Sequence, residues 1–411
     1  MTIITALFAF TLHHVLPIWV STRTLNRTVK TYDFIMAGGG MSALSLAYFL
    51  TREQPGATIA IVDPEEKGEN DRTWSYWAKD PQPFDHIATQ RWSRIRFASN
   101  EWSSAIELDP YRYFMIRSED FYDTVLAQLE HAHVDFFRDR VVDIDGSGDS
   151  ARVEGENGAW NGSWVFDSRF DPEEYANRSG PHHYLKQHFL GWTIETDENE
   201  FDPSIATLFD FRVPDSGEFR FGYILPQSAN RALVEFTLFT ANLLEKDEYV
   251  SQIENYIQNV LEIRTYRVVE QENGVIPMTD EPAVRKAQNR VLNIGTRGGL
   301  VKASTGYAFA RTQRDSIAIA TSMVRFGHPF AIPEHSRWFR LLDTMMLQVM
   351  HRRGQISDHV FANLFRKNPI DRLFRFLGEQ TTFAETLAVM ATVPWPPFIG
   401  AFFRTKLFGR I

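Results

Sequence analysis

A glycine-rich turn near the start of the chain has the residue types and spacing needed to bind a dinucleotide. The apolar run 34–37 precedes three glycines, and the apolar residues after them recur at helical spacing. Gly38-x-Gly40-x-x-Ala43 fits the G-x-G-x-x-G/A pattern, in which a tight turn and a helix N-terminus receive a pyrophosphate. The residues predicted to contact the cofactor here are Gly38, Gly39, Gly40, Met41, Ser42 and Ala43.

An acidic residue follows at the distance at which such units bind a ribose. The run 57–62 is typical of a second buried strand, and it ends at Asp63, 23 residues after Gly40. A carboxylate at that point accepts hydrogen bonds from ribose hydroxyls. An ordinary glycine turn of an α/β domain is the alternative, and the strand ending in Asp63 favours a bound adenine dinucleotide over it.

A second glycine-bearing loop occurs late in the chain. Residues 290–295 predict a buried strand, residues 296–306 a loop, and a helix is expected to begin near Phe309. Such a loop is suited to cover the ribityl chain and pyrimidine edge of a flavin. The predicted contact residues are Gly295, Thr296, Gly298, Gly299, Ser304, Thr305 and Gly306.

The loop after Asp63 adds a cation. Segment 70–77 lies between the second strand and the next helix, so Arg72 is expected to pair with cofactor phosphates or with the flavin edge. Trp74 and Trp77 in the same segment have the simpler alternative of filling the core.

Composition limits the class of protein. The chain has 411 residues, 44% of them hydrophobic, which suffices for one large or two medium folded domains. The net charge of −9 and the lack of a basic stripe argue against nucleic-acid binding, and the absence of cysteine excludes disulfides and thiol catalysis. The 33 phenylalanines indicate either an aromatic core or a long cavity for an apolar ligand.

The order of elements predicts an α/β fold: a Rossmann-like FAD-binding domain with an inserted antiparallel sheet and a helical C-terminal region. A helix capped by Ser118 and a strand at 164–169 belong to the first part. Alternating strands at 205–212, 218–224 and 231–239, the last two joined by a turn at 225–230, form the inserted sheet. The predicted division is 31–175 for the first part of the FAD domain, 176–285 for the substrate domain, 286–330 for the return and 331–411 for the helical region.

Both ends of the chain raise the question of a membrane. Residues 1–30 are predicted to be an extension or an over-long start, with a membrane-surface anchor as the alternative. Residues 386–403 carry no charge, but Pro394, Pro396 and Pro397 argue against a spanning helix. Trp395, Phe398, Phe402, Phe403 and Phe408 near Arg404, Lys406 and Arg410 suit an element lying in an anionic bilayer surface, or else an ordinary C-terminal packing segment.

Short motifs recur in order over nearly the whole chain. They are Gly38–Ala43, Asp71–Trp74, Gln187–Trp192, Leu208–Arg212, Tyr223–Pro226, Ala232–Thr237, Gly274–Met278, Gly295–Gly299 and Lys302–Tyr307. With these motifs the chain from about Tyr32 onward resembles the bacterial lycopene cyclases, flavoproteins related to the carotenoid cyclases of plants. Ala303 stands where the family usually has proline, and residues 1–30 have no counterpart in the family.

The resemblance implies FAD in its reduced form, with NADPH or NADH as the electron source. It implies lycopene as the substrate and a redox-neutral ring closure at its acyclic ends, which gives β-carotene through γ-carotene. It also implies a cytoplasmic protein peripheral to the inner face of the cell membrane. Ring type, the number of closed ends and the oligomeric state stay open.

Protonating an alkene requires an acid beside an apolar channel. The resemblance implies that Glu235, within Leu-Val-Glu-Phe-Thr, is the catalytic glutamate. Alternation places Glu235 on one strand face with Leu233, Thr237 and Phe239, where desolvation raises the pKa of a carboxyl group. A solvent-facing strand residue is the alternative, and reduced flavin is a competing proton donor.

A second carboxylate is expected to stabilise the developing cation. Asp210, which alternation places on one face with Leu208 and Arg212, is the candidate, either held by Arg212 or steering the cation. The histidines at 182, 183 and 188 fit no familiar zinc spacing, so no metal site is predicted.

Two other functions remain compatible with this pattern. A flavin-dependent monooxygenase or isoprenoid reductase would use the same fold, because fold alone does not fix function. A lipid-binding protein that has lost its flavin is the non-enzymatic alternative, and the two glycine loops with Asp63 argue against it.

Overall fold

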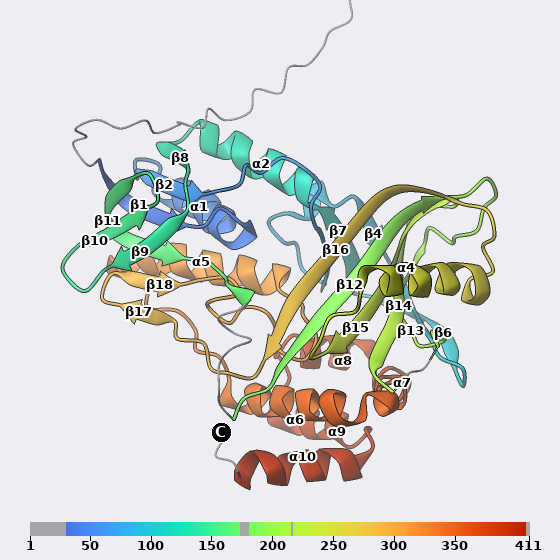
Figure 1. Cartoon of the computed structure of the whole chain (residues 1–411). Coiled ribbons are helices and arrows are strands. Elements are labelled where there is room, and N and C mark those ends of the chain that lie inside the picture. Colours follow the sequence, from blue (N-terminus) through green and yellow to red (C-terminus); the bar gives the residue numbers. More distant parts are fainter. Residues whose placement is uncertain (1–29, 173–180, 215–216, 408–411) are drawn as a thin grey trace, which may run out of the picture.

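The computed structural model describes residues 30–172, 181–214 and 217–407 (Figure 1). The predictions for residues 1–29 and for Phe408 and Arg410 lie outside this part of the chain. Figure 1 shows a mixed sheet with helices on one side of the molecule, a second long sheet on the other, and C-terminal helices beneath both. The predicted α/β architecture is therefore present.

The first sheet contains the predicted dinucleotide-binding unit. Its strands are β1 (Thr31–Ala37), β2 (Ile59–Asp63), β8 (Val134–Arg138), β9 (Val141–Asp145), β10 (Ala151–Gly155), β11 (Ala159–Asp167), β17 (Lys286–Gln288) and β18 (Val291–Asn293). Strands β18, β11, β1, β2 and β8 are parallel neighbours in that order. The late strand β18 thus returns to the first sheet, as predicted, and brings the second glycine loop to its carboxyl edge.

The two faces of this sheet are covered differently. Helices α1 (Met41–Glu53), α2 (Ser118–Glu130) and α5 (Phe309–Phe326) bury one face together with alternate β1 residues such as Phe34 and Met36. The opposite face, which includes Ile35, packs with residues of β9 and β10. This alternation of apolar side chains is what a strand buried on both faces requires.

The second sheet has seven strands and is antiparallel apart from one pair. It comprises β5 (Arg94–Ala98), β6 (Ser103–Glu107), β12 (Tyr184–Glu195), β13 (Ile205–Asp210), β14 (Phe219–Ser228), β15 (Arg231–Thr240) and β16 (Arg267–Thr279). β5 pairs parallel with β13, so residues 94–107, which lie within the range assigned to the FAD domain, extend this sheet. The turn predicted at 225–230 is wrong, because β14 continues to Ser228 and only two residues connect it to β15.

A small third sheet joins the two larger ones. It consists of β3 (Thr73–Ala78), β4 (Gln90–Trp92) and β7 (Arg112–Arg117), with β7 in the centre. Ser118 was predicted to cap the following helix, and this is wrong: the cap position is Arg117. The Ser118 hydroxyl instead accepts a hydrogen bond of 3.0 Å from the backbone N–H of Arg72, which fastens the cofactor-side loop to α2.

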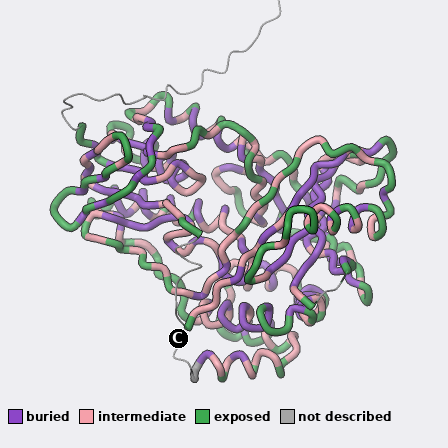
Figure 2. The backbone as a smooth tube through the Cα atoms, viewed as in Figure 1, coloured by how far each residue is buried: buried purple, intermediate pink, exposed green. Residues whose placement is uncertain are grey.

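Helices cover the second sheet. α4 (Lys246–Asn255) and the π-turn Tyr256–Val260 lie on one face, and the other face meets a C-terminal layer. That layer consists of α6 (Arg337–Arg353), α7 (Ser357–Lys367), α8 (Ile370–Leu377), α9 (Phe383–Met390) and α10 (Trp395–Leu407). Figure 2 shows buried positions along the strands of this sheet, where both faces are covered.

The C-terminal prolines delimit the last helix. Pro394 separates α9 from α10, and Pro396 and Pro397 occupy the first turn of α10, where a missing N–H costs nothing. No helix in the described part of the chain combines the length and apolar character needed to cross a membrane.

Candidate active site

The first glycine turn has the conformation that its sequence predicts. Gly38 has φ of +101°, and a Cβ there would lie 2.4 Å from the Ser168 hydroxyl oxygen. A Cβ on Gly40 would meet no atom within 4 Å, so the backbone at the start of α1 borders open space. The turn therefore leaves room for a phosphate at the helix N-terminus.

Asp63 lies against this turn, at the carboxyl end of β2. Its Oδ2 accepts a hydrogen bond of 2.6 Å from the Gly39 N–H, and its Oδ1 accepts one of 2.8 Å from the N–H of Glu65. A Cβ on Gly39 would lie 2.9 Å from the Cβ of Asp63, so glycine is required for this approach. The predicted ribose-binding carboxylate is thus positioned by the glycine turn itself.

The second glycine loop packs on the first. Gly295 and Gly299 have φ values of +60° and +76°, and a Cβ on Gly295 would lie 2.5 Å from the Ser42 hydroxyl oxygen. The loop follows β18 directly, so Gly295 and Thr296 border the N-terminus of α1. The structure brings together two glycine loops that are more than 250 residues apart, and this cradle fits a dinucleotide whose flavin extends along the second loop.

The far end of the second loop contains unpaired buried polar atoms. Gly306 has φ of +74°, and a Cβ there would lie 2.0 Å from Oε1 of Gln187. Among the described residues, this oxygen and the Thr305 hydroxyl are both buried without a hydrogen-bond partner. Buried polar groups normally have partners, so these atoms suit the polar edge of a flavin.

Ser304 is placed differently from its prediction as a cofactor contact. Its hydroxyl donates a hydrogen bond of 2.6 Å to Oδ1 of Asp343, which also accepts one of 2.8 Å from Nζ of the buried Lys302. Lys302 donates to Glu379 as well, at 2.9 Å. The Ser304 hydroxyl is therefore engaged in a network that fastens the loop to α6, because side-chain groups in such a network are already satisfied.

The salt bridges of this network are strong. Burial alone would raise the pKa of Glu379, but Lys302 and Arg311 outweigh it and lower the pKa to about 2. Arg311 donates to Glu379 over 2.6 Å from the first turn of α5. The ionised Glu379 thus holds the loop, α5 and the C-terminal layer in one arrangement.

Arg72 lies at the surface between the two halves of the site. Its Nη1 donates to the backbone oxygen of Asp71 over 2.6 Å. Its positive charge acts to lower the pKa of Glu65, beside the ribose-binding carboxylate, and also that of Glu272 in the second sheet. This position agrees with an arginine lying along the cofactor, although neither predicted contact is itself present.

Glu235 is buried on β15 with 8% of its surface exposed. Desolvation is the main cause that raises its pKa to about 8, the neighbouring carboxylate of Glu272 raises it further, and a hydrogen bond donated by Thr237 opposes the rise. The predicted elevation of this pKa is confirmed. Near neutral pH the side chain is therefore mostly an un-ionised acid that can donate a proton.

The sequence interpretation missed Glu272, the nearest acid to Glu235. Cross-strand pairing places Tyr223, Glu235, Gly191 and Glu272 in one row on one face of the sheet. A Cβ on Gly191 would lie 3.2 Å from Cγ of Glu272 and 3.7 Å from Cγ of Glu235, so the glycine lets the acids approach each other. Glu272 stands two residues before the Gly274–Met278 motif, and that spacing was the only available signal.

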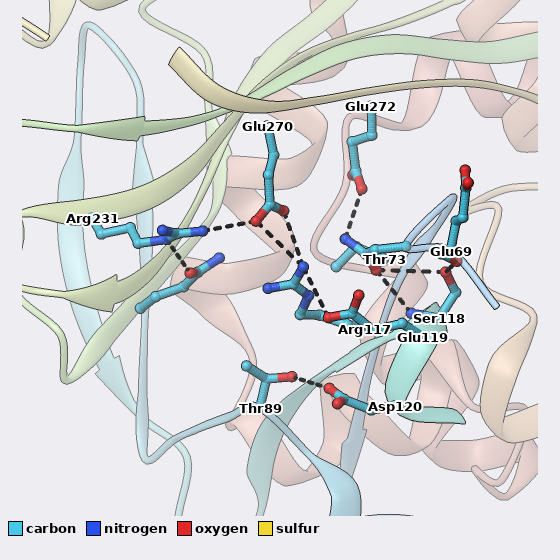
Figure 3. A network of polar contacts seen from close by, with 12 residues as sticks. Glu69, Thr73, Thr89, Arg117, Ser118, Glu119, Asp120, Arg231, Glu270 and Glu272 are labelled. Carbon is cyan, nitrogen blue, oxygen red and sulfur yellow. Dashed lines mark hydrogen bonds and ion pairs between the residues drawn. The ribbon is translucent and has the colours of Figure 1, made fainter. Parts of the chain in front are cut away.

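Figure 3 shows how Glu272 is held. The Thr73 hydroxyl from β3 donates to Glu272 over 2.7 Å, while the adjacent Glu270 binds Arg231 at 2.8 Å and Arg117 at 3.3 Å. Burial raises the pKa of Glu272, and the Thr73 bond partly offsets this. Glu270 has two arginine partners and Glu272 has a threonine, so two acids on one strand lie in opposite electrostatic environments.

Three buried tyrosines complete the Glu235 face, and the sequence interpretation assigned no role to them. The Tyr113 hydroxyl lies 2.5 Å from that of Tyr223 and 2.8 Å from that of Tyr307. Burial raises the pKa of Tyr307 to about 12 and the other two well above the usual value. They remain neutral, and the edge of the Trp77 ring contacts Tyr307 at a centroid distance of 4.7 Å.

Asp210 does not join this group. It pairs with Gly222, which pairs with Phe236, so it points to the face opposite Glu235. A register irregularity between Thr207 and Asp210 breaks the alternation, and the predicted shared face with Leu208 is wrong, since Leu208 packs with the Glu235-side cluster.

The alternative in which Arg212 holds Asp210 is confirmed. Arg212 binds both carboxylate oxygens, at 2.9 and 2.6 Å, and the buried Tyr256 hydroxyl donates to Oδ2 at 2.9 Å. These three bonds satisfy the carboxylate behind the sheet, away from both glycine loops.

Metal ligands are not grouped in the described residues. Among the predicted non-ligating histidines, His188 is buried between the hydroxyls of Thr240 and Tyr249, at 2.8 and 2.5 Å. Burial lowers its pKa to about 4, so this histidine is a neutral core residue.

Comparison with known proteins identifies the family. The model of the family described as lycopene cyclase protein matches residues 33–402. The chain belongs to this family. A lycopene beta-cyclase of Pantoea ananas is 25% identical over 396 residues, which cover 90% of this chain and 97% of the relative. Membership supports an activity on carotenoids.

Solved structures show the same fold at low identity. A geranylgeranyl bacteriochlorophyll reductase-like protein from Thermoplasma acidophilum aligns with a TM-score of 0.58 at 13% identity, covering 91% of this chain and 99% of that one. HpxO of Klebsiella pneumoniae, complexed with FAD, aligns at 0.56 and 13%, covering 85% and 98%. The predicted fold, that of FAD-dependent monooxygenases and reductases, is confirmed.

Proposed function

We propose that this protein catalyses the redox-neutral β-cyclisation of lycopene to β-carotene by way of γ-carotene, with FAD in its reduced form. The observation that carries the proposal is Glu235, a buried acid with a pKa of about 8 on the sheet of a lycopene cyclase family member. General acids work best when their pKa lies near the operating pH. The glycine cradle with Gly38, Asp63 and Gly295 would hold FAD.

The chemistry begins with a proton. The Glu235 carboxyl donates its proton to the terminal double bond, an internal alkene captures the resulting carbocation, and a ring C–H then loses a proton. One proton is gained and one is lost, so no net oxidation occurs. Glu272 supplies negative charge beside Glu235, and the neutral tyrosines exclude water and add no competing anion.

Reduced FAD supplies an electron-rich ring system that is suited to stabilise the cation. NADPH or NADH is the proposed electron source. Because the reaction is redox-neutral, many substrates turn over for each reduction of the cofactor. A monooxygenase or isoprenoid reductase, the second candidate favoured by the fold of the solved neighbours, would consume one nicotinamide per product.

A peripheral position on the inner face of the cell membrane is part of the proposal. Trp395, Ile399 and Phe403 on α10 are 59, 49 and 58% exposed, and Arg404 adjoins them. Exposed apolar side chains beside basic ones suit an anionic bilayer surface. Sedimentation with vesicles containing an anionic lipid tests this: Trp395→Ser with Phe403→Ser is expected to leave the protein in the supernatant.

Glu235→Gln in cells that accumulate lycopene tests the proposed acid. Loss of a general acid lowers the rate by about 10²–10⁴-fold, so red lycopene should persist while the purified variant keeps its yellow flavin spectrum. Glu254→Gln, an exposed change on α4, is the matched control and should yield orange-yellow carotenes. Normal carotene formation by Glu235→Gln would refute the assignment, and a colourless wild-type protein would support the lipid-binding alternative.

A further inference from the structure

A large apolar cavity lies in the C-terminal layer, outside the glycine cradle. It has a volume of 620 Å³ and is lined by residues of α6 to α10, among them Leu342, Met346, Leu364 and Phe398. This volume falls in the range of about 300–1,000 Å³ that is typical of ligand sites. The cavity is built by the part of the chain to which the sequence assigned only membrane contact.

The walls offer a ligand almost no polar partner. Lys302, Ser304 and Asp343 are polar lining residues, and their side chains bind one another. The Thr305 hydroxyl, unpaired among the described residues, is the other polar side chain of the lining. A ligand with polar groups would lose hydration there without compensation, so the cavity suits a hydrocarbon.

The cavity borders the Glu235 side of the second sheet by two routes. Thr305 lines it, and Tyr307, two residues further along the loop, belongs to the tyrosine group beside Glu235. Phe361 also lines it and stacks on Phe219 at 5.2 Å, and Phe219 lies 4.7 Å from Phe239. Phe239 is four residues after Glu235 on the same face of β15, so the cavity continues from the acid towards the helices.

The other side of the cavity reaches the surface. Leu387, Trp395, Ile399 and Phe403 line it and are nevertheless 44 to 59% exposed. Arg404 lies close enough to Arg352 and Arg353 that their charges lower its pKa, after the larger effect of burial, and none of the three forms an ion pair with a described residue. This opening is thus apolar with an adjacent cluster of positive charge, which complements an anionic lipid surface.

A second, larger cavity of 750 Å³ does not suit the same ligand. It is lined by charged residues such as Arg285, Arg311, Arg340 and Glu334. Burying a hydrocarbon against charged groups would desolvate them without providing partners.

We propose that the apolar cavity binds the half of the acyclic polyene that is not reacting, while the other end lies at Glu235. This inference rests on the proposed function and adds where the far half of the substrate is held. One acid then closes one end at each visit, and the second ring requires the molecule to leave and return reversed. At the first visit the cavity receives an acyclic end, and at the second visit it receives the bulkier β-ring.

Narrowing the cavity from α6 tests this assignment. Met346→Trp adds bulk to the lining, and Met346→Phe adds less. Forcing a ring into a narrowed, packed site is costly, so the ratio of monocyclic to bicyclic carotene should rise about tenfold with Trp and less with Phe, while lycopene is still consumed. Products are measured by chromatography of pigments from lycopene-accumulating cells and from purified, flavin-loaded protein.

Val324→Trp, a matched change at an exposed position of α5 outside the cavity, should leave the ratio as in the wild type. Thermal unfolding and flavin content identify a variant that fails to fold, in which case Met346→Phe decides. An unchanged ratio, including one with both closures slowed equally, would overturn the cavity assignment. A wild-type protein that forms no ring from lycopene contradicts instead the proposed function.

Discussion

Asp210 and Glu235 are two buried carboxylates of the same sheet, one strand apart, that face opposite sides of it. Asp210 accepts three hydrogen bonds from Arg212 and Tyr256, whereas Glu235 accepts one from Thr237 and faces a second acid. Burial alone therefore does not make a carboxyl group reactive. The partners decide: a satisfied carboxylate stabilises the fold, and a poorly satisfied one stays protonated.

Asp210→Asn should have the largest effect on stability. Breaking a buried pair leaves a charge uncompensated, and since Arg212 stays partly hydrated we expect a loss of about 2–4 kcal/mol in the free energy of unfolding. Urea unfolding measures it. Cyclisation per mole of flavin-bound protein should be unchanged, and a selective loss of turnover in a stable variant would return Asp210 to the active site.

Glu235→Gln should behave in the opposite way in a stability measurement. The pKa of Glu235 rises from 4.5 to about 8 on folding, so its contribution to stability is complete below pH 4.5 and is lost as pH rises through about 8. Glutamine removes this loss. The melting temperature of the variant relative to wild type should increase between pH 5 and pH 8.5, and a parallel pH dependence of both proteins would show that Glu235 is ionised in the fold.

Glu272→Gln should change the pH profile of cyclisation. The negative charge of Glu272 raises the pKa of Glu235, so its removal lowers that pKa. Activity requires the protonated acid and falls as pH rises through its pKa, so the alkaline limb should move to lower pH. Initial rates from pH 6 to 9 measure this. Glu254→Gln serves as the control, and a uniform loss at every pH would indicate a merely structural role.

Thr237→Val should produce a smaller shift of the opposite sign. The hydroxyl donates to Glu235 and lowers its pKa, and valine has nearly the same shape without a donor. The alkaline limb should therefore move to higher pH in the same assay. If both variants move the limb in one direction, the electrostatic account of Glu235 is wrong.

Local patterns predicted much of the cofactor-binding half. A glycine turn between a strand and a helix is specified by neighbouring residues, and Gly38 with φ of +101° shows why glycine is needed there. The face shared by Glu235 and Thr237 followed from alternation, which holds on a regular strand such as β15. The same rule failed on β13, where the irregularity before Asp210 inserts an extra residue.

By itself, the sequence determined the strand–turn–helix unit, the family and the acid most suited to donate a proton, because each depends on residues close together in the chain. The tertiary structure alone decided that Glu272 approaches Glu235 across Gly191, that Asp210 faces away, and that α6 to α10 enclose an apolar cavity. These features depend on strand register and helix packing between distant segments, and no local pattern of residues encodes such pairings.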